Sequence, residues 1–320
     1  SYNTMPGWAA FAPVRKLMTH HAELMGSKGN GIFRKIDEAI EFTDKFFTTN
    51  PTFALVNPQA KERLQQLKGM SRHYLAHEYF NRDWHPMHFS DMAEWLEPAK
   101  VQFACSATYL EHVPSINFRP EQLSFLNEIS DRMFRETIKD YLVNQQFRKD
   151  YWVKGRRAIS VAQKMDAIGS QKIILNSNME NISKKVTGAL GEANLNDDVY
   201  DPIMQSLSSY KVKSLYQIQQ DVAGKGVNGN QILEAIMVLI GSGHISPAQD
   251  EAVITKAKKT TERMNAYLTN LAKYSGEIGF LASPVTGGGI AVNRFQQLFI
   301  QATHGGKKQP QDLAMHVWLS

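Results

Sequence analysis

Short amphipathic helices separated by proline breaks are the feature that most constrains this chain. From Trp8 to Met25 and from Ile32 to Phe47 apolar residues recur at intervals of three and four, which predicts two helices with one apolar face each. A third helix is predicted from Pro58 to about Phe80. The break at Asn50-Pro51 separates the second predicted helix from the third, because a residue before proline is pushed out of the helical region. We therefore expect the chain to open with a helical core.

Two later segments have strand character. Val101 to Ser106 alternates between apolar and other residues, and Phe147 to Val153 is a second such segment edged with charge. Helices are predicted between them, from Pro120 to Ile129 and from Asp131 to Asn144. The two strands suit an antiparallel end to an otherwise parallel sheet, with these helices as an insertion.

After Ser160 the pattern changes to three short helices and a short strand-like segment, Gly243 to Pro247. Three helices followed by a hairpin are typical of a winged helix. A longer helix, a strand-like segment with a glycine turn, and a last helix follow. The predicted helices after Ser160 are Asp198–Ser208, Ser214–Val222, Asn230–Ile240, Thr255–Lys273 and Ile290–Ala302. We divide the chain into residues 1–160 and 161–320.

Composition indicates an ordinary globular protein. With 320 residues and 42% hydrophobic residues, there is room for two domains. The single cysteine, Cys105, excludes an internal disulfide framework and any multi-cysteine metal site, so the cytoplasm is the expected compartment. We expect Cys105 to be a small buried hydrophobe in its strand. No stretch is long and apolar enough to predict a secretion signal or a membrane span.

We expect the clustered basic residues and the histidines to have structural roles rather than to form a binding or metal site. The net charge of +5 is mild, and the basic residues clustered between 148 and 164 are expected to face water. They are Arg148, Lys149, Lys154, Arg156, Arg157 and Lys164. His73 and His77 share a helix face that could hold zinc, and His85 and His88 follow. The catalytic zinc pattern needs glutamate directly after the first histidine, where this chain has Tyr74, so we predict no metal site.

The opening SYNTMPGW resembles a segment of bacterial S-adenosylmethionine-dependent methyltransferases that carry a methyltransferase regulatory region. The resemblance continues at residues 74–79, at Phe89 with Asp91, at residues 146–148 and at residues 281–289. It covers nearly the whole chain, and the family is similar to protein-lysine methyltransferases. The matching residues of the opening are Ser1, Tyr2, Asn3, Pro6, Gly7 and Trp8.

The resemblance implies that the chain is the C-terminal part of such an enzyme. Val101 to Ser106 and Phe147 to Val153 would be the sixth and seventh strands of a class I methyltransferase sheet, whose first five strands would precede Ser1. No G-x-G-x-x-G follows a strand, and we interpret Gly287 to Gly289 as a turn. We therefore expect S-adenosylmethionine to be the cofactor of the intact enzyme and not of this fragment alone.

The fold class expected is mostly α with a minor β component, ending in a winged-helix-like α+β domain. The implied partners are an N-terminal S-adenosylmethionine-binding domain and a protein substrate; a homo-oligomer is left open. The first alternative is a DNA-binding winged-helix regulator, and a weaker one is a zinc hydrolase built on the histidines. The regulator is disfavoured, because the third short helix offers only Asn230, Gln231 and Glu234 as exposed polar residues and no cation. A scaffold or substrate platform fits better.

Tyr2, Asn3 and Trp8 are the candidate site residues. The resemblance places them where a parallel strand ends at its carboxyl end, and ligands of open α/β sheets bind there. Amides, hydroxyls and aromatic faces suit the positioning of an amine in methyl transfer. The alternative is a structural loop in which Asn3 caps a turn and Trp8 fills a core.

Overall fold

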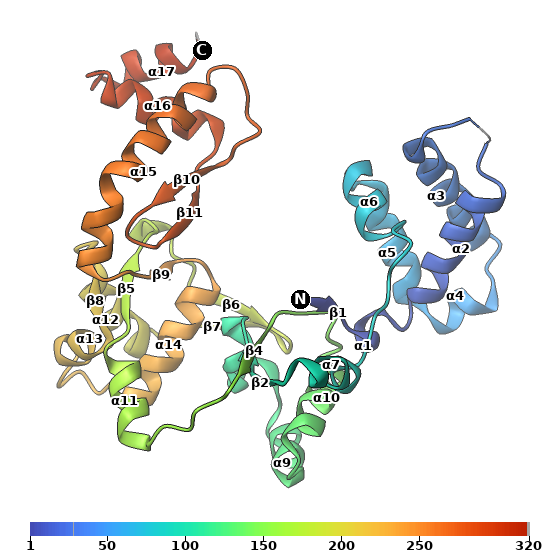
Figure 1. Cartoon of the computed structure of the whole chain (residues 1–320), viewed down its shortest axis with the longest axis horizontal. Coiled ribbons are helices and arrows are strands. Elements are labelled where there is room, and N and C mark those ends of the chain that lie inside the picture. Colours follow the sequence, from blue (N-terminus) through green and yellow to red (C-terminus); the bar gives the residue numbers. More distant parts are fainter. Residues whose placement is uncertain (28, 319–320) are drawn as a thin grey trace. The chain divides into compact units, whose positions relative to one another are not determined.

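A computed structural model describes residues 1–27 and 29–318, and the protein is mostly helical with small sheets, as predicted. The chain forms two compact units (Figure 1). Unit 1 comprises Ser1–Arg157 with Thr187–Gly191, and unit 2 comprises Ala158–Val186 with Glu192–Ser320.

Unit 1 opens with helices that bury their apolar faces against one another. Met18, Ile36, Leu64 and Leu75 are fully buried in this core. One prediction was wrong in detail: the helix expected from Pro58 to Phe80 is broken, because the chain turns after Gly69, whose N–H donates to Gln66 O at 3.2 Å. The helices are α1 (Met5–Trp8), α2 (Ala12–Leu24), α3 (Ile32–Thr48), α4 (Thr52–Val56), α5 (Pro58–Lys68) and α6 (Arg72–Glu78).

The second part of unit 1 contains the predicted strand pair. Strands β2 (Val101–Ser106) and β4 (Asp150–Lys154) pair antiparallel, which confirms that pairing. The expected single strand from Phe147 to Val153 is interrupted at Lys149: β3 (Phe147–Arg148) pairs instead with β1 (Tyr2–Asn3). The remaining elements are α7 (Phe89–Leu96), η1 (Glu97–Ala99), η2 (Tyr109–His112), α8 (Pro114–Asn117), α9 (Pro120–Glu128) and α10 (Arg132–Leu142).

Unit 2 holds the three predicted short helices, α12 (Asp197–Leu207), α13 (Leu215–Asp221) and α14 (Gly229–Gly241), around a small sheet. The strand after α14, β9 (Ile245–Pro247), does not turn back in a hairpin as expected. It pairs with an earlier strand, in the order β8-β5-β9. The other elements up to this point are α11 (Val161–Gly169), β5 (Lys172–Leu175), η3 (Met179–Asn181) and β8 (Lys213–Ser214). Strands β6 (Lys185–Gly188) and β7 (Gly191–Asn194) pair with each other, and the residues at their turn, Thr187–Gly191, belong to unit 1.

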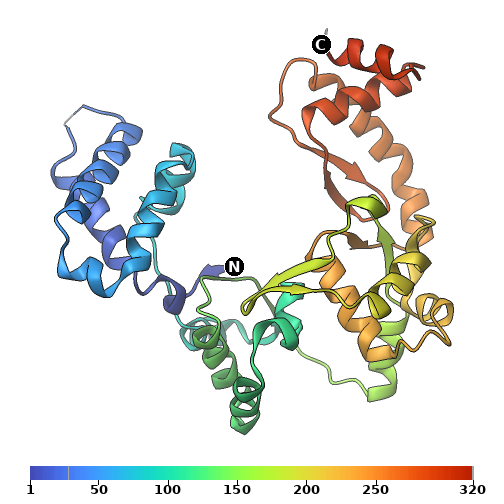
Figure 2. The same cartoon turned by 180° about the vertical axis from the view of Figure 1, so that it is seen from behind.

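The end of unit 2 places a hairpin beside a long helix. Helix α15 (Glu251–Leu271) lies along β10 (Phe280–Ser283) and β11 (Gly288–Ala291) in both views (Figure 1, Figure 2). The helix predicted from Ile290 begins later, as α16 (Arg294–His304), because the Asn293 side chain caps it and the preceding residues pair in the hairpin. Helix α17 (Pro310–Trp318) follows.

The third short helix faces inward. Ile232, Ile236 and Leu239 of α14 are buried, so this helix uses its apolar surface for the core of unit 2. Among the helices of residues 1–27 and 29–318, none is both long and apolar enough to cross a membrane.

Candidate functional site at the carboxyl end of strand β2

A buried arginine organises the first unit. The side chain of Arg148 is 3% exposed and contacts three carboxylates: Glu136 at 3.0 Å, Asp140 at 2.6 Å and Asp150 at 2.9 Å. Its guanidinium lies 4.5 Å from the centre of the Phe89 ring. The prediction that the basic residues from 148 to 164 face water was wrong for Arg148, because successive residues of a strand point to opposite faces and only alternate ones can stay in water.

The three carboxylates around Arg148 are not equally stabilised in their charged form. Burial raises the pKa of Asp140 to about 6, although Arg148 acts in the opposite direction. One oxygen of this carboxylate, Oδ2, has no hydrogen-bond partner within the described part of the chain. Burial would also raise the pKa of Glu136, but contacts with Lys139 and Arg148 hold it below the ordinary value. Asp140 is therefore the least well compensated member of the cluster.

Tyr2 is attached to this cluster. Its hydroxyl donates to Asp150 Oδ2 at 3.1 Å, and the side chain is 9% exposed. Burial raises the pKa of the phenol well above its ordinary value, so Tyr2 stays protonated and keeps donating. The contact fixes β1 to the arginine cluster.

Asn3 and the loop after it are held by main-chain bonds. The Asn3 carbonyl accepts from Met87 N–H at 3.1 Å, and Gly7 N–H donates to Gln145 O at 2.8 Å. The Thr4 hydroxyl also donates to Gln145 O. Within residues 1–27 and 29–318 no hydrogen bond is formed by the half-buried Asn3 side chain, so its amide is available to a ligand.

Trp8 lies in the helical core. It is 6% exposed, and its Nε1 donates to Gln146 O at 3.0 Å. The Arg63 guanidinium is 4.0 Å from its ring centre, and Tyr79 and Trp84 pack against it edge to face. These contacts describe the core-filling alternative for Trp8, whereas Tyr2 and Asn3 lie at the strand pair.

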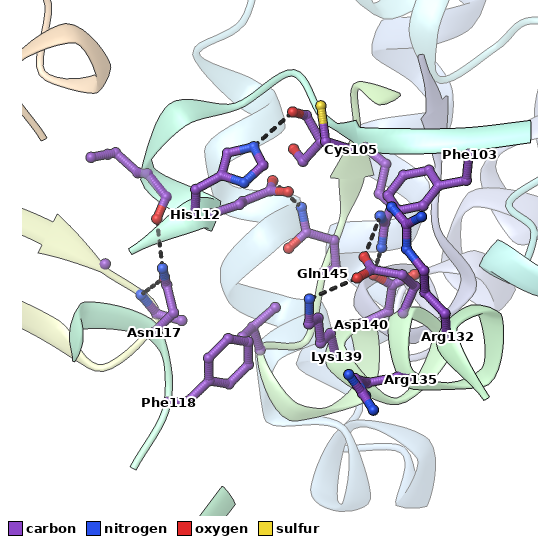
Figure 3. A pocket seen from close by; sticks show the side chains of 18 of the residues that line it. Phe103, Cys105, His112, Asn117, Phe118, Arg132, Arg135, Lys139, Asp140 and Gln145 are labelled. Carbon is purple, nitrogen blue, oxygen red and sulfur yellow. Dashed lines mark hydrogen bonds and ion pairs between the residues drawn. The ribbon is translucent and has the colours of Figure 1, made fainter. Parts of the chain in front are cut away.

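A cavity of about 590 Å³ lies where β2 ends (Figure 3). Its walls are β2, the segment that follows β2, helix α10 and residues 187–189, all of which belong to unit 1. Sequence reasoning did not find this cavity, because its residues come from four separate segments. The only signal in the sequence was the strand pair that positions it.

The polar side chains at one end of the cavity are fixed by hydrogen bonds. Gln145 Nε2 donates to Glu111 Oε1 at 2.9 Å and to Phe147 O at 2.8 Å. His112 Nε2 is 2.8 Å from Ser106 O. Because Gln145 also accepts from the loop of residues 4–7 through its carbonyl, it connects the cavity to that loop.

The cysteine is less buried than expected, and two of the histidines pack against aromatic rings. Cys105 is half-buried and lines the cavity, and burial raises the pKa of its thiol. His73 contacts Phe33 edge to face, and His88 stacks on Tyr141. In residues 1–27 and 29–318 no three histidine, cysteine or acidic side chains are grouped so as to hold a metal ion.

Comparison with known proteins gives a family match for part of unit 1. Residues 71–154 match the family described as "Predicted methyltransferase regulatory domain". This segment of the chain is therefore similar to a methyltransferase regulatory domain. That segment includes β2, α10, β3 and β4, and thus most of the cavity wall.

Relatives match nearly the whole chain. An uncharacterized protein of Synechocystis, sll1526, is 35% identical over 318 residues, which is 99% of this chain and 61% of the relative. An uncharacterized protein of Rickettsia prowazekii, RP789, is 24% identical over 156 residues, 46% of this chain and 26% of the relative. The chain thus spans less than two thirds of the length of these curated relatives.

The fold has a counterpart among solved structures. PKMT2 from Rickettsia typhi in complex with AdoHcy superposes with a TM-score of 0.59 and 14% identity, covering 99% of this chain and 65% of that chain. A second structure of PKMT2 from Rickettsia typhi gives a TM-score of 0.58, covering 92% of this chain and 61% of that chain.

Proposed function

We propose that the chain is the regulatory and substrate-binding portion of an S-adenosylmethionine-dependent methyltransferase that acts on protein lysine. The observation that carries the proposal is the regulatory-domain match over residues 71–154, the segment that builds the strand pair and the cavity. The fold likeness to PKMT2, which was solved with AdoHcy, supports the same cofactor class.

Strand order supports a methyltransferase sheet. Residues 147–154 pair antiparallel with β1 at their beginning and with β2 along the rest. Strands β1 and β2 are therefore parallel to each other, and their carboxyl ends, Asn3 and Ser106, lie at the same edge. This is the arrangement expected of the fifth, seventh and sixth strands of a class I sheet, and ligands of such sheets bind at that edge.

The active cleft would then lie beside Tyr2 and Asn3. Trp8 would anchor the loop that follows Asn3 through its contacts in the helical core. The Asn3 amide is suited to orienting an amine, while Tyr2 and Asp150 hold its strand in place. S-adenosylmethionine would be held by a preceding domain, because Gly287 to Gly289 belong to the β10–β11 hairpin and do not precede a phosphate-binding helix.

Unit 2 serves as a scaffold or protein-substrate platform in this proposal, with residue 160 as the functional boundary. Its three helices and small sheet suit a winged-helix-like module whose third helix buries its apolar face in the core of unit 2. Neither the family match nor the solved structures support the DNA-binding alternative.

The test uses the longer protein that includes a preceding cofactor domain. We expect it to transfer the labelled methyl group of S-adenosylmethionine to heat-denatured lysozyme and not to the same protein with acetylated lysines. Residues 1–320 alone should transfer none. Equal labelling of both acceptors would refute lysine as the target, and transfer by residues 1–320 alone would refute the need for a preceding domain.

A further inference from the structure

Two arginines of the cavity wall carry charges that no carboxylate balances. Arg132 donates to Ala104 O at 2.5 Å, and Arg135 donates from Nε to Ile129 O at 3.0 Å. Both partners are neutral carbonyl groups. Within the described part of the chain neither arginine forms an ion pair, and both line the cavity at the end formed by α10.

The acidic groups nearby are engaged by other cations, except for one oxygen, Asp140 Oδ2, which has no hydrogen-bond partner within the described part of the chain. Glu136 pairs with Lys139 at 2.7 Å and with Arg148 at 3.0 Å, and Asp140 and Asp150 pair with Arg148. The positive charge of Arg132 and Arg135 is therefore left for a group that enters the cavity. Arg132 also lies 5.3 Å from the ring centre of Phe103, a position that holds its guanidinium over the β2 wall.

Apolar side chains form much of the remaining wall. Phe103 and Phe118 are 4% and 8% exposed, and Leu110 and Val143 complete the lining. Figure 3 shows Phe103 and Arg132 on one side of the cavity and Phe118 and His112 on the other. A cavity of about 590 Å³ with apolar walls and a few polar groups has the size and lining of small-molecule sites.

A carboxylate in the lining disfavours a second negative charge on the ligand. Glu111 lines the cavity, and one of its oxygens, Oε1, is held by Gln145. An anionic group placed beside Glu111 would meet its carboxylate, whereas a hydrogen-bond donor would be accepted. The lining therefore offers two arginines on α10, apolar side chains such as Phe103 and Phe118, and a carboxylate at Glu111.

We propose that this cavity binds an organic monoanion whose charged group lies at Arg132 and Arg135 and whose apolar body lies against Phe103 and Phe118. The regulatory-domain match contains all four residues, which makes the cavity a ligand site of that domain. The proposal goes beyond methyl transfer and does not depend on the acceptor.

Three probes with one apolar body test the charge preference. Binding of 4-phenylbutyrate, 4-phenylbutylamine and 4-phenyl-1-butanol to residues 1–320 is measured by calorimetry without S-adenosylmethionine. We expect the butyrate to bind roughly tenfold more tightly than the amine and the alcohol, the effect of charge-assisted hydrogen bonds. Equal affinities, tightest binding of the amine, or no binding of any probe would overturn the proposal.

Two variants and a control locate the site. R132Q with R135Q should reduce butyrate affinity to that of the alcohol and leave the alcohol unchanged. Ala189→Trp, in the opposite wall, should abolish binding of all three probes while both arginines remain. Arg156→Gln removes a cation outside the cavity and should change nothing. An equal loss of butyrate affinity in Arg156→Gln would show that the attraction is nonspecific.

Methyl transfer is a separate readout. Failure of the lysozyme assay would leave these affinities unaffected, and failure of the probes to bind would leave the proposed function standing.

Discussion

A buried guanidinium is tolerated only while its N–H groups meet acceptors, and Arg148 meets three carboxylates at once. Arg148→Met should destabilise the protein by about 3–5 kcal/mol, because it leaves buried carboxylates without their cation. Urea unfolding of both proteins measures the difference. Arg156→Met, which removes an exposed arginine, should change stability by less than about 0.5 kcal/mol. Equal midpoints for the two variants would contradict a central role of Arg148.

The same cluster makes stability depend on pH through Asp140. Burial raises the pKa of this carboxyl from 3.8 to about 6, so the folded protein holds the proton more tightly than the unfolded chain does. Its stabilising effect is present below about pH 4 and is lost as pH rises to about 6.

We therefore expect the stability of the wild type relative to Asp140→Asn to fall between pH 4 and 7, by at most about 3 kcal/mol. Urea titrations of both proteins at several pH values measure it. A stability difference that does not change with pH would show that Asp140 keeps an ordinary pKa.

The free amide of Asn3 predicts an effect on turnover. In the longer protein, Asn3→Ala should lower kcat roughly tenfold or more without a comparable change in Tm, because loss of a positioning contact acts on the transition state. Asn127→Ala, at an exposed position of α9, is the control. Unchanged turnover in Asn3→Ala would assign the loop a structural role only.

At the scale of elements, the loop between β1 and α2 depends on a close approach of two main chains. A Cβ on Gly7 would lie 2.4 Å from Gln145 O, which is main chain and cannot move aside easily. Gly7→Ala should therefore destabilise the protein by about 1–3 kcal/mol. Gly31→Ala adds the same atom where nothing lies within 4 Å, and thermal unfolding of the two variants provides the comparison. An equal Tm would mean that the loop can shift away.

Helices and strands differed in how far the sequence predicted them. Periodicity located α3 and α12 to α14 closely, because each buries one face, and α12 to α14 also begin at a side-chain cap, whereas α15 begins four residues earlier than predicted and has no such cap. It did not reveal that Phe147–Arg148 leaves β2 for β1, because pairing with Tyr2–Asn3 depends on residues far away in the chain. The burial of Arg148 was missed for the same reason: its three carboxylate partners come from α10 and β4, and its neighbours in sequence are ordinary surface cations.

At the scale of the whole molecule, the missing glycine loop predicts weak or absent cofactor binding. Calorimetry of residues 1–320 with S-adenosylmethionine should give no micromolar binding, because the described strands are not followed by a glycine-rich turn that opens a phosphate-binding helix. The longer protein is the positive control. Micromolar binding by residues 1–320 would move the cofactor site into this chain.

The position of Cys105 has a practical consequence. It is the single cysteine of the chain, and it lines the cavity at the end of β2. A maleimide fluorophore would therefore label one known place without any prior mutagenesis, at a modest rate because burial raises the pKa of the thiol. Protection of this thiol from labelling would report occupancy of the cavity in a crude extract, so that its natural ligand could be sought by fractionation rather than by guessing.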